Sequence, residues 1–434
     1  MAHEDDLFSL YFEYVKETES PTIYHRWALI TAVGAFLGRQ FWFPDGDGKI
    51  FPNCYVMLIG NPGTRKSTAI KKVSKILRAA GYDHFAAEKT TKEKFLLDLE
   101  GAEDGSDSYL SATNRSRSGS GGPSARDILA TMDLDDGGET HDGVPREVFV
   151  TADEFNEFVG TGNMDFLSML GALWDWDSET STYKHRFKNS KSISIYQPTI
   201  SILGGNTHAG FQAAFPEAAI GQGFLSRLIL VYSEPSGRKI TFPPKPDERL
   251  AVQLMEKLNR IRETVKGEAT RTQAATTALD AIYRTWKDLE DGRFKSYSTR
   301  RFTHLKKLCL IVTAMRGVTR IDIQDVTLAN SILHYTEASM PKALGEYGRS
   351  RNSIATHNLM TALYESKKPL TIEELYKVVQ RDLDKKDQIT DLLKNLSEAG
   401  KITWVKEAQG FIPLMQKVNS RAVYVDMKML QEYM

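Results

Sequence analysis

The 434-residue sequence predicts an α/β protein in which a parallel sheet lies between layers of helices. Three observations support this fold class. Short, continuous apolar runs, such as "NCYVMLIG" (53–60) and "PTISILGG" (198–205), are typical of strands that are buried on both faces. Stretches with apolar residues at helical spacing separate these runs, as expected of parallel strands joined by helices. From about residue 246 the pattern becomes entirely helical.

Composition and charge limit the classes of function. The sequence is 41% hydrophobic, with 56 basic and 56 acidic side chains and no net charge. This balance excludes a globally basic nucleic-acid coat, so any contact with nucleic acid must come from a local patch. Cys54 and Cys309 each lie in an apolar run, which favours buried free thiols in a reducing compartment over a disulfide or a metal site. The acidic N-terminus lacks the basic segment of a signal peptide, and no apolar stretch approaches ~18 residues. We therefore expect a cytoplasmic protein without membrane contact.

Shifts in composition predict four parts of the chain. The polar segment 101–144, rich in Gly, Ser and Asp, is expected to be an exposed, flexible insertion in the α/β core, with one short helix near "ARDILATM". The expected parts are an N-terminal helical segment (1–50), an α/β core (51–245), a helical domain (246–350) and a small C-terminal domain (351–434).

The segment "GNPGTRKST" follows the first buried strand and opens a helix, which is the setting of a phosphate-binding loop. Backbone N–H groups and a helix N-terminus converge on an anion in such a loop. Lys66 would neutralise the terminal phosphates of ATP, and the Ser67 hydroxyl would bind Mg²⁺. Arg65 departs from the pattern G-x-x-x-x-G-K-[ST], because glycine adopts strained backbone angles at little cost. The alternative is an ordinary junction between a strand and a helix. The expected ATP-binding residues are Gly60, Asn61, Pro62, Gly63, Thr64, Arg65, Lys66, Ser67 and Thr68.

A pair of carboxylates follows a second apolar strand in "VFVTADEF". We expect Asp153 to complete the Mg²⁺ site with Ser67, and Glu154 to polarise the attacking water. An exposed acidic turn at the end of a strand is the alternative. Because both motifs occur in the expected order, the sequence predicts an ATPase.

Two further polar residues lie at the ends of apolar strands. Asn206, in "SILGGNTH", is placed to orient the attacking water. Arg227, in "GFLSRLILVY", precedes a strand, and a cation there can be supplied to the γ-phosphate of a neighbouring subunit. The alternative for Arg227 is a local ion pair with Glu234.

These motifs follow one another as they do in AAA+ ATPases, and the resemblance covers roughly residues 50–340. The "LSR" turn resembles the arginine-finger motif of the minichromosome-maintenance replicative helicases, and "STRRFTHLKKLCLIVTA" resembles their lid helix. The resemblance extends to ATPases of phages and plasmids that serve as replicative helicases or primase-helicases. It implies a P-loop AAA+ core, a helical lid at 246–350 and a second sensor arginine at Arg300, with Arg301 as the alternative. The sequence departs from the family pattern in two respects: Arg65 stands in place of the second glycine of the loop, and a large N-terminal DNA-binding domain is lacking. No primase signature is present either.

The C-terminal part is predicted to be a winged-helix domain, which also fits that family. Three helices are expected in "IATHNLMTALYE", "LTIEELYKVVQ" and "KDQITDLLKNLSEAG", and a two-stranded wing in "KITWVKE" and "AVYVDM". Thr371 and Glu374 have the spacing of a capping box. The third helix is mixed in charge, which argues against strong reading of duplex DNA and leaves a protein partner open.

A DNA contact is expected just before the strand that ends in Asn206, where the resemblance implies a hairpin that projects into the channel of the ring. In "STYKHRFKNSKSISIYQPT", cations alternate with aromatic residues, which suits phosphate tracking and base stacking on a single strand. A solvated basic turn is the alternative. Arg115 and Arg117 of the insertion are weaker candidates. The expected DNA-binding residues are Lys184, His185, Arg186, Lys188 and Lys191.

Together these features predict a homo-oligomeric, hexameric ATP-dependent DNA helicase that moves on single-stranded DNA in phage- or plasmid-type replication, with other replication proteins as further partners. If phage-encoded, it would act in the host cytoplasm. The alternatives are an AAA+ helicase loader or nucleoprotein remodeller without processive unwinding, and a non-hydrolysing scaffold in which Arg65 has spoiled the loop. ATP turnover separates the scaffold from the two enzymes, and DNA-stimulated turnover with strand displacement separates the helicase from the loader.

Overall fold

The computed structural model describes most of the chain. Contacts divide the protein into a first unit, Met1–Ala343 with Val423–Met434, and a second unit, Leu344–Ala422. The N-terminal segment (1–50), the α/β core (51–245) and the helical domain expected over 246–350, as far as Ala343, belong to the first unit. Residues 423–434, which were expected in the C-terminal domain, also belong to the first unit. The described residues are 6–101, 143–176, 182–185, 192–216, 223–345, 351–366, 368–383, 385–398, 401–414 and 422–432.

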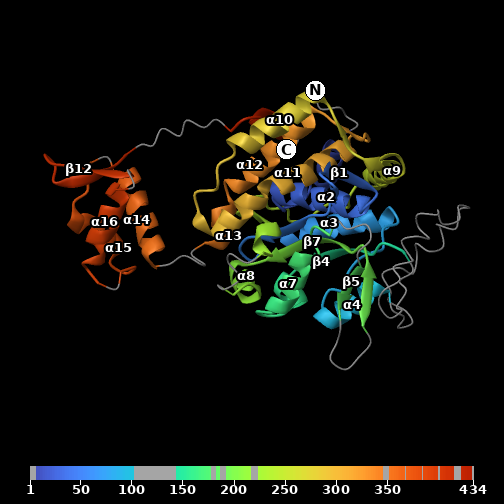
Figure 1. Cartoon of the computed structure of the whole chain (residues 1–434), viewed down its shortest axis with the longest axis horizontal. Coiled ribbons are helices and arrows are strands. Elements are labelled where there is room, and N and C mark those ends of the chain that lie inside the picture. Colours follow the sequence, from blue (N-terminus) through green and yellow to red (C-terminus); the bar gives the residue numbers. More distant parts are fainter. Residues whose placement is uncertain are drawn as a thin grey trace, which may run out of the picture. The chain divides into compact units, whose positions relative to one another are not determined.

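A four-stranded parallel sheet lies at the centre of the first unit (Figure 1). Its strand order is β4-β7-β3-β8, and every neighbouring pair runs parallel. The two central strands are completely buried, because apolar side chains point to both faces. The expected α/β class with a parallel sheet is therefore confirmed. The strands are β3 (Tyr55–Ile59), β4 (Glu147–Ala152), β7 (Thr199–Asn206) and β8 (Leu228–Tyr232).

Helices cover both faces of this sheet. In Figure 1, α2 and α3 lie above the sheet and α7 and α8 lie below it. Tyr55 shows the lower contact, because its hydroxyl donates to the carbonyl of Leu170 in α7 at 2.8 Å. The helices nearest the sheet are α2 (Thr22–Leu37), α3 (Lys66–Ala79), α6 (Phe155–Val159), α7 (Met164–Ala172) and α8 (His208–Ala214).

The rest of the first unit is mainly helical. Its helices are α1 (Leu7–Val15), α4 (Lys92–Glu100), α9 (Glu248–Thr264), α10 (Gln273–Thr285), α11 (Lys295–Met315), α12 (Ile323–Glu337), α13 (Met340–Leu344) and α17 (Met427–Glu432). Short strands join them: β1 (Phe41–Asp45), β2 (Gly48–Ile50), β9 (Gly267–Glu268), β10 (Thr270–Arg271) and β11 (Arg320–Ile321). Within the N-terminal segment that was expected to be helical (1–50), the helices end at Leu37, and β1 follows with alternate residues buried. Cys54 and Cys309 are buried free thiols, as expected.

An antiparallel hairpin precedes β7. It consists of β5 (Thr182–His185) and β6 (Ile193–Tyr196), and Thr182 pairs with Tyr196. A hairpin was expected in this interval. The insertion expected at 101–144 falls, apart from its ends, on residues outside the described part of the chain.

In its described residues, the second unit contains three helices and one hairpin. They are α14 (Arg351–Glu365), α15 (Ile372–Val379), α16 (Gln388–Glu398), β12 (Ile402–Val405) and β13 (Gly410–Pro413). Leucines of α14, α15 and α16 form its core, together with Ile389 and Ile402. The expected capping box of Thr371 and Glu374 is confirmed.

The prediction that "AVYVDM" forms a strand of the wing was wrong. β12 pairs instead with β13, which follows it after a four-residue turn. Residues 423–426 belong to the first unit: Asn330 Nδ2 donates to the carbonyls of Val423 and Tyr424 at 3.0 and 3.2 Å, and Asp426 N–H donates to Ser331 Oγ at 2.9 Å. These contacts with α12 compete successfully with strand pairing. None of the helices in the described part of the chain has the length and apolar character needed to span a bilayer.

Candidate functional site

Three of the predicted motifs meet at the carboxyl edge of the sheet. The loop 60–66 follows β3, Asp153 and Glu154 follow β4, and Asn206 ends β7. Ile59 is in register with Asn206, and Gly60 N–H donates to the Asn206 carbonyl at 3.4 Å. A Cβ at Gly205 would lie 2.6 Å from the Asp153 carbonyl oxygen, so this close approach requires glycine. Segments more than 140 residues apart in sequence therefore share one edge.

The loop between β3 and α3 is tightly wound. Gly60 has room for no side chain, because a Cβ there would lie 2.5 Å from the Tyr24 hydroxyl. That hydroxyl donates to the Ile59 carbonyl at 2.7 Å and so ties α2 to the start of the loop. Gly63 has a φ of +84°, a left-handed conformation that favours glycine. Thr64 N–H closes the turn on the Asn61 carbonyl at 3.2 Å.

Lys66 lies inside this loop and is only 7% exposed. Its ammonium donates to the carbonyls of Gly60 and Asn61 at 2.8 and 3.2 Å and to Thr64 Oγ1 at 3.2 Å. Burial lowers the pKa of Lys66, and the nearby charge of Glu154 opposes this effect. The N-terminus of α3 has no side-chain cap, so its N–H groups are available to an anion. A cation and a helix N-terminus thus converge, as binding of a phosphate requires.

Arg65 adopts the backbone conformation that the pattern reserves for glycine. Its φ is +61° and its ψ is +33°, in the left-handed region. The side chain turns to Glu19, where Arg65 Nε donates to Oε2 at 2.7 Å. Glu19 Oε1 also accepts from Ile240 N–H at 2.8 Å. This backbone hydrogen bond, followed by that from Arg65, lowers the pKa of Glu19. An arginine thus occupies the left-handed position at which the pattern has its second glycine.

The strained conformation of Arg65 leads to a stability prediction. Arg65→Gly and Arg65→Ala both remove the contact with Glu19, but only alanine keeps the strained backbone. We therefore expect the glycine variant to be more stable than the alanine variant by about 1 kcal/mol in urea unfolding. At the exposed helical position Lys75 the order should be reversed by a similar amount. Equal stability of the two Arg65 variants would show that the loop relaxes when the side chain is lost.

The two predicted carboxylates have different surroundings. Asp153 Oδ2 lies 2.7 Å from Lys71 Nζ, and this hydrogen bond raises the pKa of Lys71. Burial raises the pKa of Glu154, while the charge of Lys66 opposes the shift. Lys71 was not expected from the sequence, because it lies outside the loop pattern. A proton acceptor next to a buried cation is compatible with the role expected for Glu154.

Asn206 is completely buried at the end of β7. Its Oδ1 has no hydrogen-bond partner among the described residues, and the same is true of Asn156 Oδ1. A Cβ at Gly210 would lie 2.9 Å from the first of these oxygens and 3.1 Å from the second. Two amide groups thus converge near Asp153 and Glu154. Asn156 was not expected from the sequence.

Arg227 lies at the opposite edge of the sheet. It precedes β8, whose Leu228 pairs with Tyr55 at the start of β3. Arg227 NH1 donates to the Gly223 carbonyl at 2.6 Å, and NH2 lies 3.7 Å from Asp175 Oδ1. The alternative ion pair with Glu234 was wrong, because Glu234 follows β8 and instead accepts a hydrogen bond from Tyr232.

Arg300 meets the same carboxylate as Arg227. Its NH1 lies 2.8 Å from Asp175 Oδ2, and its side chain is 31% exposed. The alternative, Arg301, is 2% exposed and bonds Glu337 and Asn330 at 2.8 and 2.7 Å inside the helical layer. Of the two arginines, Arg300 therefore lies with Arg227. Asp175 was not expected from the sequence.

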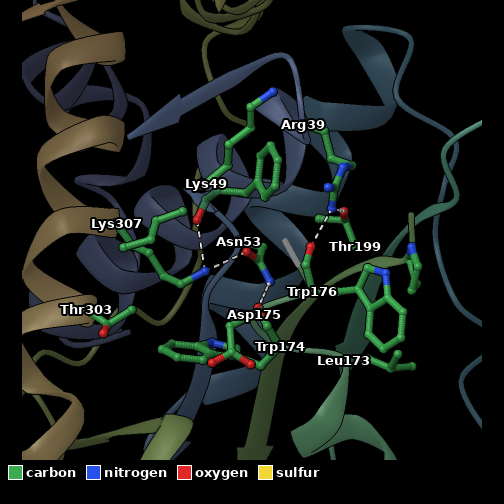
Figure 2. A pocket seen from close by; sticks show the side chains of 13 residues that line it. Arg39, Lys49, Asn53, Leu173, Trp174, Asp175, Trp176, Thr199, Thr303 and Lys307 are labelled. Carbon is green, nitrogen blue, oxygen red and sulfur yellow. Dashed lines mark hydrogen bonds between the residues drawn. The ribbon is translucent and has the colours of Figure 1, made fainter. Parts of the chain in front are cut away.

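Figure 2 shows the pocket beside Asp175 at this edge of the sheet. Lys307 is buried there and donates to the Phe51 carbonyl at 2.9 Å and to Asn53 Oδ1 at 2.6 Å. Burial lowers the pKa of Lys307 to about 8. Asn53 Nδ2 donates in turn to the Trp174 carbonyl at 2.8 Å. These bonds fix the chain just before Asp175.

Only part of the expected DNA contact lies on described residues. Lys184 is exposed in β5, and His185 stacks with Tyr183 at 6.5 Å between ring centroids. Tyr183 also meets Trp176 edge to face at 5.9 Å. The expected residues Arg186, Lys188 and Lys191 lie outside the described part of the chain, as do Arg115 and Arg117.

No protein-family model matches this chain, and a search of curated proteins finds no match either. The functional interpretation of both edges of the sheet therefore depends on the residues themselves and their geometry.

Proposed function

We propose that the protein is an ATPase of the AAA+ type. The observation that carries this proposal is the meeting of a glycine-containing loop, a buried lysine, two carboxylates and a buried asparagine at one edge of a parallel sheet. Lys66 would neutralise the terminal phosphates of ATP, and Ser67 and Asp153 would hold Mg²⁺. Glu154 would accept a proton from the attacking water, and Asn206 would orient that water.

The ion pair of Asp153 with Lys71 is compatible with this site. It would have to open for Asp153 to reach a metal, and a permanent pair would favour the non-hydrolysing scaffold. Lys71 is exposed, however, and an exposed ion pair contributes only about 0–1 kcal/mol. A divalent cation between carboxylate and phosphate oxygens therefore competes well with Lys71.

We further propose that the site is completed by a second copy of the chain. Arg227 and Arg300 lie at the amino edge of the sheet, and the loop lies at the carboxyl edge. The five-residue strand β3 separates these edges by about 16 Å, so neither arginine reaches its own loop. A head-to-tail interface would bring the arginines of one subunit to the loop of the next. Repetition of such an interface closes a ring, for which we propose six subunits.

The proposed activity is ATP-dependent movement on single-stranded DNA, as in a phage- or plasmid-type replicative helicase. The β5–β6 hairpin would carry the DNA contact. The second unit, with three helices and a hairpin, would act as a winged helix that contacts DNA or another replication protein. An AAA+ loader is the second candidate, because the same ATP site serves both functions.

A variant of the basic segment 184–188 distinguishes the helicase from the loader. Replacing Lys184, Arg186 and Lys188 with Ala removes three cations from one segment. We expect weaker single-strand binding, with a salt dependence flattened by about 0.7 per lost phosphate contact. Basal ATP turnover should remain, because none of the three residues belongs to the loop or to the carboxylate pair. Stimulation by DNA and strand displacement should be lost.

A matched control variant removes three exposed cations from α9 and α10, which are distant in sequence from the hairpin. Arg249, Arg260 and Arg284, all changed to Ala, should leave DNA binding and its salt dependence at the parent level. If instead the hairpin variant unwinds DNA like the parent, the DNA contact lies elsewhere. A parent protein that hydrolyses ATP but displaces no strand would favour the loader.

A further inference from the structure

One carboxylate serves two arginines from distant segments. Asp175 follows α7 after a short turn and divides its oxygens: Oδ1 lies 3.7 Å from Arg227 NH2, and Oδ2 lies 2.8 Å from Arg300 NH1. Both guanidinium groups also lie against the ring of Trp174, with centroid distances of 5.9 and 5.8 Å. The two cations are thus gathered at one place on the amino edge of the sheet.

The two arginines would not stay together without a negative charge. The pKa of Arg227 is lowered first by burial and then by the charge of Arg300, which shows that the guanidinium groups repel each other. Asp175 offsets one of the two positive charges and leaves the group with a net charge of one. Arg227 Nε is buried and has no hydrogen-bond partner among the described residues. A net positive charge therefore remains at this place for an incoming anion.

Trp174, the residue before Asp175, is held by several contacts. The Trp174 carbonyl is held by Asn53, and the Trp174 ring packs against Lys307 Nζ at 4.5 Å and against the neutral ring of His304 at 5.0 Å. Burial lowers the pKa of His304 to about 3, so this ring adds no charge near neutral pH. Arg300, His304 and Lys307 lie on one face of α11, because positions i, i+4 and i+7 align on a helix. Figure 2 shows Asp175 and Trp174 beside Lys307 and Thr303 of this helix.

We propose that Asp175 is a positioning residue, which sets the spacing between Arg227 and Arg300 so that both meet the terminal phosphate bound by a second copy of the chain. This inference depends on the proposed ATPase function. Without the carboxylate, repulsion would separate the guanidinium groups, and each would contact the phosphate less well. Asp175 itself does not touch the nucleotide.

The test is Asp175→Asn, which keeps the size of the side chain and removes its charge. We expect kcat to fall about 10-fold with KM unchanged, as is typical of the loss of a coupled charged neighbour. In an Arg300→Ala background only one guanidinium group remains to be positioned. The same change should then cost no more than about twofold.

Mixing subunits separates positioning from loss of folding. Asp175→Asn subunits retain an intact loop, and Lys66→Ala subunits retain an intact arginine pair. A mixture of the two should therefore hydrolyse ATP faster than either variant alone, and an unfolded subunit would not produce this gain. The matched control is Asp280→Asn, which removes the charge of an exposed carboxylate paired with Arg284 at 2.8 Å on α10. It should hydrolyse ATP like the parent.

Three outcomes would overturn the inference. They are a kcat of Asp175→Asn equal to that of the parent, an equal cost of Asp175→Asn in the Arg300→Ala background, and no gain in ATP turnover on mixing. If the parent protein hydrolyses ATP, each of these outcomes would refute only the role of Asp175. A parent protein without ATP turnover would refute the proposed function, and the role of Asp175 with it.

Discussion

Lys66→Ala should abolish ATP turnover. The Lys66 ammonium is buried in the loop, within 3.2 Å of two loop carbonyls and of Thr64 Oγ1, so it is already placed where terminal phosphates would bind. The other lysine near this edge, Lys71, is directed to Asp153 and is exposed. A cation lost from a site of this kind is not replaced by its neighbours. Steady-state phosphate release measures the effect.

Lys75→Ala is the control for this variant. Lys75 lies on the same helix as Lys66 but is exposed, so the change should leave turnover and stability nearly unaltered. Residual turnover of Lys66→Ala near the parent level would remove the loop from the mechanism. Equal loss in both variants would indicate damage to α3 rather than to a phosphate site.

Arg227→Ala should lower hydrolysis by about 10³-fold while ATP binding stays intact, as expected when an arginine is supplied by a neighbouring subunit. The guanidinium group lies at the amino edge of the sheet, and the strand β3, about 16 Å long, separates this edge from the loop of the same subunit. Its loss therefore leaves the binding site of that subunit unchanged. Equilibrium binding of a nucleotide analogue and steady-state turnover separate the two effects.

Arg284→Ala, on the exposed face of α10, controls for the loss of a surface arginine and should hydrolyse ATP normally. An Arg227→Ala variant with parent activity would contradict the role of Arg227. So would full ATPase activity of the parent protein at concentrations at which it is monomeric.

The buried strands were predictable because each is a short apolar run next to a turn. The hairpin of the second unit was only half predictable. "AVYVDM" has the alternation of a strand, but contacts with Asn330 and Ser331 in α12 determine its conformation. Such tertiary contacts leave no pattern in a local stretch of sequence.

The carboxyl edge of the site was predictable because its residues directly follow strands, and parallel strands end at the same edge. The contacts of Glu19, Lys71 and Asp175 could not be predicted from the sequence. Each is one of many charged residues, and only the fold brings it to its partner. The conformation of Arg65 was also beyond prediction. The left-handed conformation, with φ +61°, costs energy in a non-glycine residue, and the sequence does not show that Arg65 adopts it.

The most direct test of a site shared between subunits combines two inactive variants. Arg227→Ala subunits carry an intact loop, and Lys66→Ala subunits carry an intact arginine. Mixed assemblies contain interfaces at which the intact loop of one subunit meets the intact arginine of the next. ATP turnover of the mixture should rise well above that of either variant alone and depend on the mixing ratio. Turnover that stays at the level of the separate variants at every ratio, although mixed assemblies form, would contradict it.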